Sequence, residues 1–450
     1  MTQLFRFFAT GKDKSLIADP QRIDKLYRRN RISVLLTVTI GYGFVYTCRL
    51  GLSVVKKPLI DTEIFTASEL GMIGAAIMYG YAFGKLINGF LADHANVKRF
   101  FATGVMFTAL INLAMGRTSL LWVWVLLWGF NGWFQGFGAP TGAVTIANWF
   151  SKRERGISYG IFSTGQNIGE GMTFFGSAAL VSFFGWQWGF WGPGIFCIFI
   201  AFAIYHFLQD RPQTLGLPSV ADWKNDHGVP EGDSGSQPQK TGKAQLQMLK
   251  LPSIWVLGLA SATMYVTRYA INSWGILYLQ EAKSYSAIEA GSLVGLSALV
   301  GVAGSVAYGI ISDRLFNARR PPVTLIFGLV EVLALLVIFF SPFAHPFLLT
   351  ISFALYGFTL NGLLAVLGGL FAIDIAPKKA AGAAMGFIGV FSYVGAAIQE
   401  MISGHLIEKG TTFIDGVRHY DFSGAIIFWI GASVLSVILA ALLWRTQVRD

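Results

Sequence analysis

The chain has 450 residues, of which 54% are hydrophobic, 15% are aromatic and only 13% are charged. Soluble domains have about a quarter of their residues charged, so this composition excludes a soluble globular protein and predicts a polytopic membrane protein. A net charge of +10 would suggest nucleic-acid binding in a soluble protein. Here the basic residues lie in short loops between apolar runs, where positive charge holds loops on the cytoplasmic side, so no nucleic-acid partner is expected.

The first segment, residues 1–31, is polar and basic. It is too long and too charged for the leading region of a signal peptide, so we expect it to stay attached to the protein. Apolar runs of about the twenty residues that cross a bilayer core follow it. The first set lies at 32–54, 69–92, 100–116, 119–141, 155–184 and 186–208, and the second at 252–280, 287–312, 322–341, 346–373, 382–406 and 423–445.

A polar linker at 209–251, which contains several prolines and glycines, separates the two sets. The sequence therefore predicts an all-α membrane protein with twelve transmembrane helices in two six-helix halves. The halves are expected at 32–208 and 252–445, and a short tail follows at 446–450.

The basic residues also predict the orientation in the membrane. Clusters such as Lys98-Arg99 and Arg319-Arg320 fall on the same side of the predicted spans as the linker and both termini. The opposite loops are expected to hold few basic residues, among them Lys56 and Lys57. Both termini and the linker are therefore assigned to the cytoplasm.

Two arginines interrupt predicted spans. Arg49 lies in the first span and Arg268 in the seventh, and each follows a tyrosine three residues earlier, Tyr46 and Tyr265. The arginines are 219 residues apart. A guanidinium in hydrocarbon costs at least a few kcal/mol, so such residues usually face a protein interior or a water-filled path and serve a function. We interpret the pair as a substrate clamp, with one arginine from each half.

A loop motif repeats at nearly the same interval. The pattern Gly-x-x-Ala/Ser-Asp-His/Arg with trailing basic residues follows the second and eighth predicted spans, and its aspartates, Asp93 and Asp313, are 220 residues apart. Matching intervals indicate a duplicated unit, which in transporters places the binding site between the repeats. The motif resembles the signature loop of the major facilitator superfamily. This resemblance implies the major facilitator fold and a gating role for Asp93, Arg99, Asp313 and Arg314.

Three longer segments carry a narrower resemblance: Trp149–Gly156, Asp210–Pro218 and Ala376–Gly382. They are similar to the organophosphate:phosphate antiporter family, and the similarity runs from about residue 20 to the C-terminus. That family includes bacterial glycerol-3-phosphate and hexose-6-phosphate transporters and a transporter-like sensor, to which the segment 210–218 is especially similar. The resemblance places the family's paired phosphate-binding arginines on Arg49 and Arg268.

The chemistry of these positions agrees with the resemblance. A guanidinium presents a planar fork of donors that matches phosphate oxygens and stays charged. Tyr42, Tyr46 and Arg49 are spaced i, i+4 and i+7, so they share one helix face and offer two hydroxyl groups beside the guanidinium. In the alternative interpretation, a buried carboxylate neutralises each arginine and the pair serves packing alone.

The resemblance implies six further substrate-binding positions: Tyr81, Lys85, Gln166, Tyr265, Asn361 and Tyr393. For Lys85 the alternative is a side chain that extends to the membrane interface. Gln166 replaces a histidine of the family pattern and Asn361 a tyrosine, while Leu50 and Ala298 replace charged positions. The phosphate end of the pocket is therefore expected to be retained and the specificity end altered, so no particular sugar or glycerol phosphate is predicted.

Two further intramembrane acids, Glu170 and Glu400, are interpreted either as structural partners or as pocket residues. The six histidines are scattered without ligand spacing and no phosphate-binding loop of the nucleotide type occurs, so neither a metal, a cofactor nor an enzyme is expected.

The predicted function is a cell inner-membrane antiporter that exchanges an organic phosphate for inorganic phosphate by alternating access. Its partners are then these small molecules and the lipid bilayer. One alternative is a membrane receptor that binds hexose phosphate with the same clamp and signals to a histidine kinase. A second alternative is a proton-coupled anion symporter that uses Glu170 or Glu400.

Overall fold

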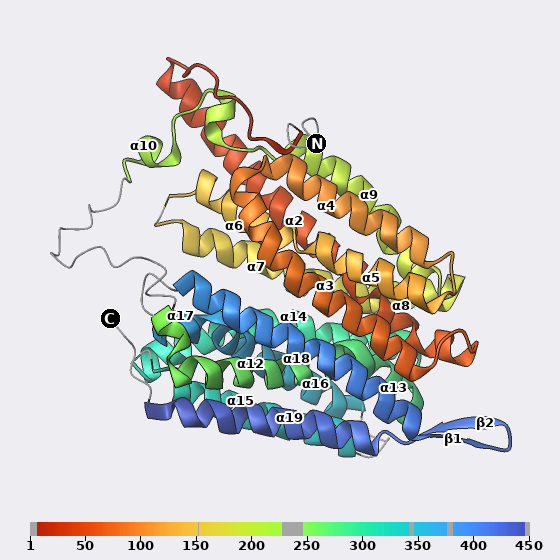
Figure 1. Ribbon diagram of the computed structural model, residues 1–450. Helices are drawn as coiled ribbons and strands as arrows, with labels where there is room; N and C mark the ends of the chain where they lie inside the picture. Colours follow the sequence, from red (N-terminus) through yellow and green to blue (C-terminus); the bar gives the residue numbers. More distant parts are fainter. Residues whose placement is uncertain are drawn as a thin grey trace.

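The computed structural model describes residues 7–151, 153–226, 246–317, 319–341, 346–375 and 381–445, and these are nearly all helical. Figure 1 shows the helices in two groups, one formed before the linker and one after it. The first group contains α2 (Pro20–Asp61), α3 (Ala67–His94), α4 (Val97–Met115), α5 (Leu121–Gln135), α6 (Gly138–Trp149), α7 (Arg155–Met172), the π-helical η1 (Thr173–Ser177), α8 (Ala178–Phe184) and α9 (Trp188–Phe207).

The second group follows the short helices η2 (Pro212–Leu215) and α10 (Val220–Lys224). It contains α12 (Pro252–Tyr269), the π-helical η3 (Ala270–Trp274), α13 (Gly275–Ala282), α14 (Ala287–Leu315), α15 (Arg320–Phe340), α16 (Pro346–Ala365), the π-helical η4 (Val366–Leu370), α17 (Phe371–Ile375), α18 (Ala381–Lys409), α19 (Ser423–Leu442) and η6 (Leu443–Arg445). A two-stranded antiparallel hairpin, β1 (Thr411–Ile414) and β2 (Val417–Tyr420), joins α18 to α19. We call the end of the groups near α10 the linker end and the opposite end the hairpin end (Figure 1).

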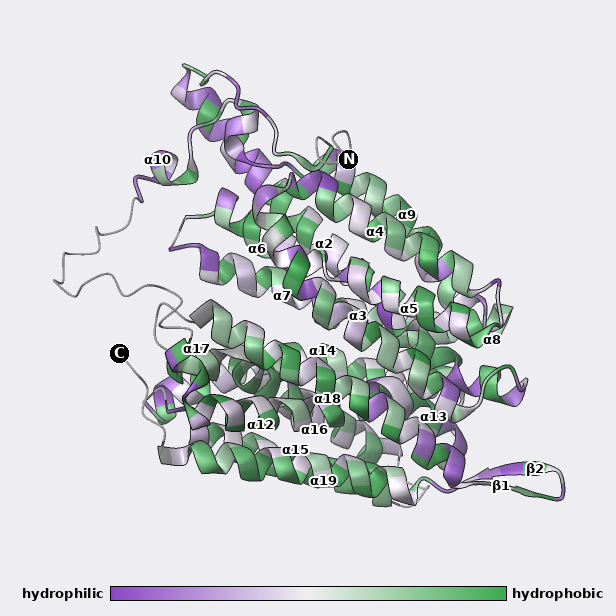
Figure 2. Cartoon of the chain, viewed as in Figure 1, coloured by the Kyte–Doolittle hydropathy of each residue, from purple (hydrophilic) through white to green (hydrophobic). Residues whose placement is uncertain are grey.

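The helices have the lengths and surfaces of membrane spans. Within the part of the chain that the structure describes, ten helices are long and apolar enough to cross a bilayer. Figure 2 shows hydrophobic residues along the outward faces of both groups, and large side chains such as Phe183, Phe199 and Ile427 are exposed there. Such a surface fits lipid and not water. The prediction of a helical membrane protein is confirmed.

Side-chain caps explain where several helices begin. Asp19 accepts the backbone N–H of Gln21 at 2.9 Å, and Pro20 occupies the first position of α2, where a missing N–H carries no penalty. Capping boxes start α3 and α14, formed by the pairs Thr66/Glu69 and Ser286/Glu289. The two boxes stand at corresponding places in the two groups, which extends the internal repeat to the helix starts.

The structure corrects several expected boundaries. The first helix, expected at 32–54, extends from Pro20 to Asp61, because its polar first turns pack on other protein segments that hydropathy does not detect. Fully buried Tyr27, for example, stacks on Trp223 with ring centres 4.1 Å apart. The expected span 119–141 is interrupted at Gly136, between α5 and α6.

Two further features were not predicted. The expected spans at 155–184, 252–280 and 346–373 contain π-helical turns, which a hydropathy pattern does not reveal because their side chains remain apolar. The β1–β2 hairpin was also missed, so the prediction of a purely α-helical chain was wrong in this segment. Its strands are four residues each, too short for a clear alternating pattern.

The helices α3 and α18, one from each group, cross closely at the hairpin end. A Cβ atom on Gly71 would lie 2.5 Å from the backbone oxygen of Glu400, and one on Gly404 would lie 2.5 Å from that of Ala67. Toward the linker end, a Cβ on Gly89 of α3 or on Gly386 of α18 would meet no described atom within 4 Å. The two helices therefore touch at the hairpin end and diverge toward the linker end.

We expect Gly71→Ala to destabilise this crossing by about 1–3 kcal/mol, because the added methyl group overpacks the contact with the α18 backbone. Thermal unfolding of the detergent-solubilised protein measures the effect. Gly431→Ala in α19 is the control, since no described atom lies within 4 Å of its Cβ position. An equal change in both variants would contradict the close crossing.

Candidate functional site

Arg49 lies within α2, and aromatic rings surround its guanidinium. The residue is only 3% exposed. The guanidinium carbon lies 4.2 Å from the ring centre of Tyr81 and 5.4 Å and 5.5 Å from those of Tyr46 and Tyr393. Nη2 donates a hydrogen bond to the Tyr269 hydroxyl at 3.0 Å. Within the described residues Arg49 forms no ion pair, and its Nε has no hydrogen-bond partner.

Arg268, near the end of α12, has a different environment. Its guanidinium forms an ion pair with the carboxylate of Glu170, and both side chains are buried. The same carboxylate accepts weaker hydrogen bonds from the Gln166 amide at 3.3 Å and the Asn272 amide at 3.4 Å. The two guanidinium groups therefore differ, because a protein carboxylate neutralises Arg268 but none among the described residues neutralises Arg49.

Tyr269 connects the two arginines. Its hydroxyl accepts from Arg49, while its ring centre lies 5.7 Å from the guanidinium carbon of Arg268. Because α2 and α12 belong to different groups, this tyrosine and the Arg268–Glu170 pair both join the two groups at the site. The π-helical turns η1 and η3 begin shortly after Glu170 and Tyr269, and such turns change the direction of side chains and often occur at functional sites.

A second buried ion pair lies farther along the same face of α2. The Lys56 ammonium is 3.1 Å from the Glu400 carboxylate and donates to the Ser273 hydroxyl at 2.7 Å. The Trp274 indole N–H donates to the same carboxylate at 3.0 Å, and its ring centre lies 3.3 Å from the ammonium. Lys56 and Glu400 are 0% and 1% exposed, so the pair is fully buried between the two groups.

The expectation that Lys56 lies in a loop was wrong. The helix α2 continues to Asp61, and Lys56 follows Arg49 by two turns, so the same face carries both side chains inward. A cavity of about 20 Å³, the size of one water molecule, lies between Arg49 and Glu400 and is lined by Ser53 and Asn272 among others. Repeated basic residues at this spacing on one face could have identified Lys56 from the sequence.

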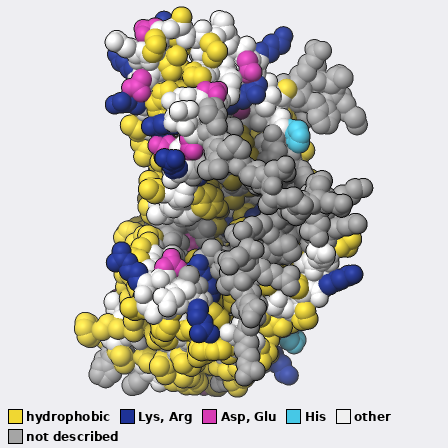
Figure 3. All heavy atoms as spheres, turned by 90° about the vertical axis from the view of Figure 1, so that its left-hand side faces the viewer, with side chains coloured by type: hydrophobic (Ala, Val, Ile, Leu, Met, Phe, Trp, Pro, Cys, Tyr) yellow, Lys and Arg dark blue, Asp and Glu magenta, His cyan; other side chains and the backbone are white. Residues whose placement is uncertain are grey.

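A larger cavity opens beside the Arg49 site toward the linker end. It has a volume of about 350 Å³ and lies between α3, α6 and α7 of one group and α18 of the other. Lys85, Pro140, Tyr159 and Tyr393 are among its lining residues. The Tyr393 ring centre also lies 5.5 Å from the Arg49 guanidinium carbon, so this ring stands between the cavity and the guanidinium. Figure 3 views the linker end and shows Lys and Arg side chains on both sides of the recess between the groups.

The other expected pocket residues differ in how near they lie to the arginines. The Tyr42 ring packs on Tyr46 and Phe162, with centres 5.4 Å and 4.7 Å apart, so Tyr42 lies one layer away from Arg49. The ring centre of Tyr265 lies 5.8 Å from the Arg268 guanidinium carbon. Lys85 is exposed and lines the larger cavity.

In the part of the chain that the structure describes, no hydrogen bond joins Asn361 to either arginine. Its amide donates to the backbone oxygen of Gly357 on its own helix at 3.1 Å. The site also contains Tyr269, Asn272, Ser273 and Trp274, which were not predicted as site residues. They follow Arg268 directly in the sequence, and Asn272, Ser273 and Trp274 belong to the π-helical turn η3.

The expected gating residues lie away from the arginines, at the linker end. Asp313 pairs with Arg320 at 2.8 Å, while Arg314 is exposed. Arg99 donates to the backbone oxygen of Phe7 at 2.9 Å. The side chain of Asp93 lies outside the part that the structure describes, and the gating role of all four residues stays a prediction.

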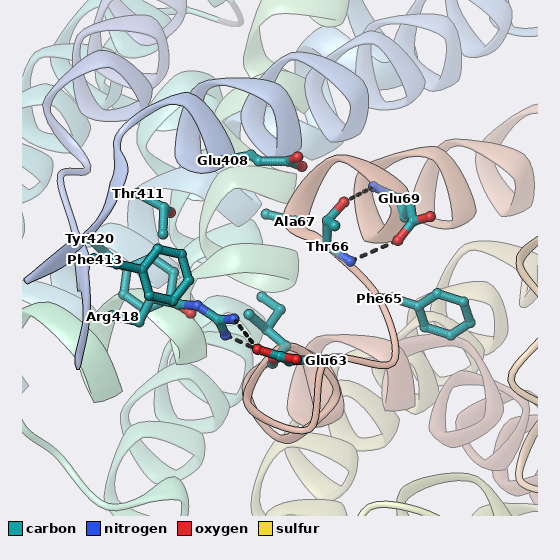
Figure 4. Close-up of a pocket in the computed structure, with 11 residues that line it drawn as sticks. Glu63, Phe65, Thr66, Ala67, Glu69, Glu408, Thr411, Phe413, Arg418 and Tyr420 are labelled. Carbon is teal, nitrogen blue, oxygen red and sulfur yellow. Dashed lines mark hydrogen bonds and ion pairs between the residues drawn. The ribbon is translucent and has the colours of Figure 1, made fainter. Parts of the chain in front are cut away.

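At the hairpin end, polar contacts join the two groups. Arg418 of β2 donates to the backbone oxygen of Ile60 at 2.7 Å and lies 3.9 Å from the Glu63 carboxylate, and Lys57 pairs with Glu281. Arg418, Ile60 and Glu63 are among the residues that line a pocket of about 340 Å³ between the α2–α3 turn and the hairpin (Figure 4). The molecule is thus held together at this end, whereas the cavity that reaches Tyr393 lies toward the linker end.

Two groups of membrane-spanning helices with buried charged residues between them are the architecture of transporter-type membrane proteins. The sequence pattern of the Major Facilitator Superfamily matches residues 38–400, so the chain belongs to that superfamily. The fold agrees: a bacterial homologue of the human lysosomal transporter Spinster, solved in an inward-facing conformation, superimposes with a TM-score of 0.74 over 92% of this chain and 96% of that one, at 17% identity.

Curated relatives define the family more narrowly. The membrane sensor protein UhpC of Salmonella typhimurium is 32% identical over 88% of this chain and 89% of its own. A probable hexose phosphate transport protein of Chlamydia pneumoniae is 34% identical over 99% and 98%. The chain is a member of the organophosphate:phosphate antiporter family, as the sequence motifs indicated. It is a transporter-type membrane protein and not an enzyme.

Proposed function

We propose that this protein is a secondary active transporter that exchanges an organic phosphate, of the sugar phosphate or glycerol phosphate class, for inorganic phosphate by alternating access. The observation that carries this proposal is Arg49, a buried guanidinium without a carboxylate partner in the described chain, which packs on Tyr393, a residue that lines a cavity between the two helix groups. Its donor fork suits two phosphate oxygens. The name of the hexose phosphate relative supports the same class of substrate.

In this proposal Arg49 and Arg268 bind the phosphate from opposite groups, so that binding draws the groups together. The residues proposed to line the substrate path are Tyr42, Tyr46, Tyr81, Lys85, Gln166, Tyr265, Asn361 and Tyr393. Asn361 has the weakest support, because its amide bonds within its own helix. The phosphate group would replace contacts that tyrosine hydroxyls and the Glu170 carboxylate now make.

We further propose twelve spans in two six-helix halves, 32–208 and 252–445, with residues 1–31, 209–251 and 446–450 in the cytoplasm. The broken helix α5–α6 and the composite helix α7–η1–α8 would add two spans to the ten apolar helices. Basic residues at the linker end support this end as the cytoplasmic one. The membrane in this proposal is the cell inner membrane.

Counterflow in liposomes tests the function. Purified protein is reconstituted into vesicles loaded with labelled inorganic phosphate, and phosphorylated sugars, glycerol phosphate, phosphoglycerate, sulfate or citrate are added outside. We expect phosphorylated compounds to accelerate release of the label and the other two anions to have little effect. If no phosphorylated compound binds or exchanges, the proposal is wrong.

The second candidate is a membrane receptor that signals to a histidine kinase. The similarity to a membrane sensor protein over most of the chain favours it. It predicts saturable binding of a hexose phosphate without exchange in the same vesicles. The proton-coupled symporter has less support, because Glu170 and Glu400 are both held in ion pairs.

A further inference from the structure

The ion pair between Glu170 and Arg268 joins the two helix groups at the substrate site. Glu170 belongs to α7 of the first group and Arg268 to α12 of the second. A carboxylate presents two oxygens to a guanidinium, as a phosphate does. Glu170 therefore occupies the position at Arg268 that a bound phosphate would take in the proposed clamp.

We propose that Glu170 substitutes for the substrate anion when no substrate is bound, so that the carrier also reorients without substrate. The protein then catalyses net transport of phosphate compounds in addition to exchange. This inference rests on the proposed function, because it concerns the same clamp.

The physical argument concerns charge. In a clamp of two guanidinium groups alone, bringing the groups together without an anion places two like charges close in a medium of low dielectric, which resists closure. Obligatory exchange follows from that resistance, because the empty carrier stays in one orientation. Here Glu170 neutralises Arg268 from within the protein. The remaining charge on Arg49 is stabilised by the Tyr81 ring and by the hydrogen bond to Tyr269.

The carboxylate is also placed so that substrate can displace it. Its bonds from the Gln166 and Asn272 amides, at 3.3 Å and 3.4 Å, are longer than the usual N–H···O range, so Arg268 is its main partner. Glu170 lies three residues before the first residue of the π-helical turn η1, where a local change of helix geometry can move the side chain. A doubly charged phosphate can thus bind Arg268 in place of the Glu170 carboxylate, whose side chain then moves back toward its own helix α7.

The experiment compares two rates in the same vesicles. Vesicles are loaded with labelled inorganic phosphate and diluted into medium with or without phosphate, in the presence of valinomycin and potassium to remove the membrane potential. For the wild-type protein we expect net efflux within about tenfold of the exchange rate. In Glu170→Gln the ratio of net efflux to exchange should fall at least about tenfold, because the neutral amide no longer neutralises Arg268.

Glu331→Gln is the matched control, because Glu331 is a buried carboxyl group of α15 outside the site. It should leave the ratio unchanged, and thermal unfolding shows whether both variants are folded. If the wild-type protein exchanges phosphate but its net efflux rate is below about one hundredth of its exchange rate, the inference is overturned and the proposed function stays intact. An unchanged ratio in folded Glu170→Gln would overturn the role of Glu170. If the wild-type protein neither binds nor exchanges phosphate, the proposed function fails, and the inference fails with it.

Discussion

Replacing Arg49 with lysine is expected to weaken phosphate binding and exchange by about 100-fold or more, since the loss of a buried charge-assisted contact costs about 2–5 kcal/mol. Arg49 is the buried guanidinium that no carboxylate of the described chain neutralises, so a bound anion is the partner that its charge lacks. A lysine keeps the charge but loses the planar fork and the stacking on Tyr81. Equilibrium binding of labelled phosphate to the purified variant measures the loss.

Arg418→Lys is the control for this prediction. Its guanidinium lies at the hairpin end, where it contacts Ile60 and Glu63 and lies outside the proposed site. We expect phosphate affinity within about threefold of the wild type in this variant, because peripheral substitutions change free energies by only a few tenths of a kcal/mol. Undiminished exchange in Arg49→Lys would exclude the arginine clamp.

Glu400→Gln and Lys56→Met should each destabilise the protein by about 3–5 kcal/mol, because each leaves the other charge buried without its partner. The pair is completely buried, and Trp274 and Ser273 surround it on the side of the second group. The double variant should recover part of the loss, since neither charge then remains. Thermal unfolding of all three variants in detergent gives the coupling energy.

Lys57→Met provides a matched control at the next residue. Lys57 pairs with Glu281 and with Asp61, but its side chain is 31% exposed. A partly solvated pair contributes about 0–1 kcal/mol, so we expect a much smaller change. Equal destabilisation by Lys56→Met and Lys57→Met would contradict a special role for the buried pair. The same substitutions test what closes the hairpin end, because Lys56 and Glu400 separate if α2 and α18 part there.

Much of the fold was predictable from local pattern. Long apolar runs located most membrane helices, and the repeated arginines and loop aspartates located the duplication. The predicted helix boundaries were wrong where tertiary contacts, and not hydropathy, decide where a helix begins or ends. The first turns of α2 are polar yet helical because Tyr27 and its neighbours pack on the linker segment, and the π-helical turns leave no trace in composition.

The sequence predicted which charged residues form the candidate site better than it predicted the contacts that these residues make. The repeat interval paired Arg49 with Arg268, but periodicity gives only the face on which a side chain lies. It did not reveal that Tyr269 would receive the Arg49 hydrogen bond or that Asn361 would bond within its own helix. Lys56 was assigned to a loop because a charged residue near the end of an apolar run usually marks one.

The sequence by itself determined that this is a helical membrane protein of the organophosphate:phosphate antiporter family with one intramembrane arginine in each half. Hydropathy, charge position and repeat interval are properties of the linear chain and predicted the membrane helices and the duplication, while the family was indicated by the resemblance of its motifs. Only the tertiary structure decided which charges meet. Glu170 reaches Arg268 and Glu400 reaches Lys56 across the two groups, and partners so distant in sequence are selected by helix packing, which no local pattern records.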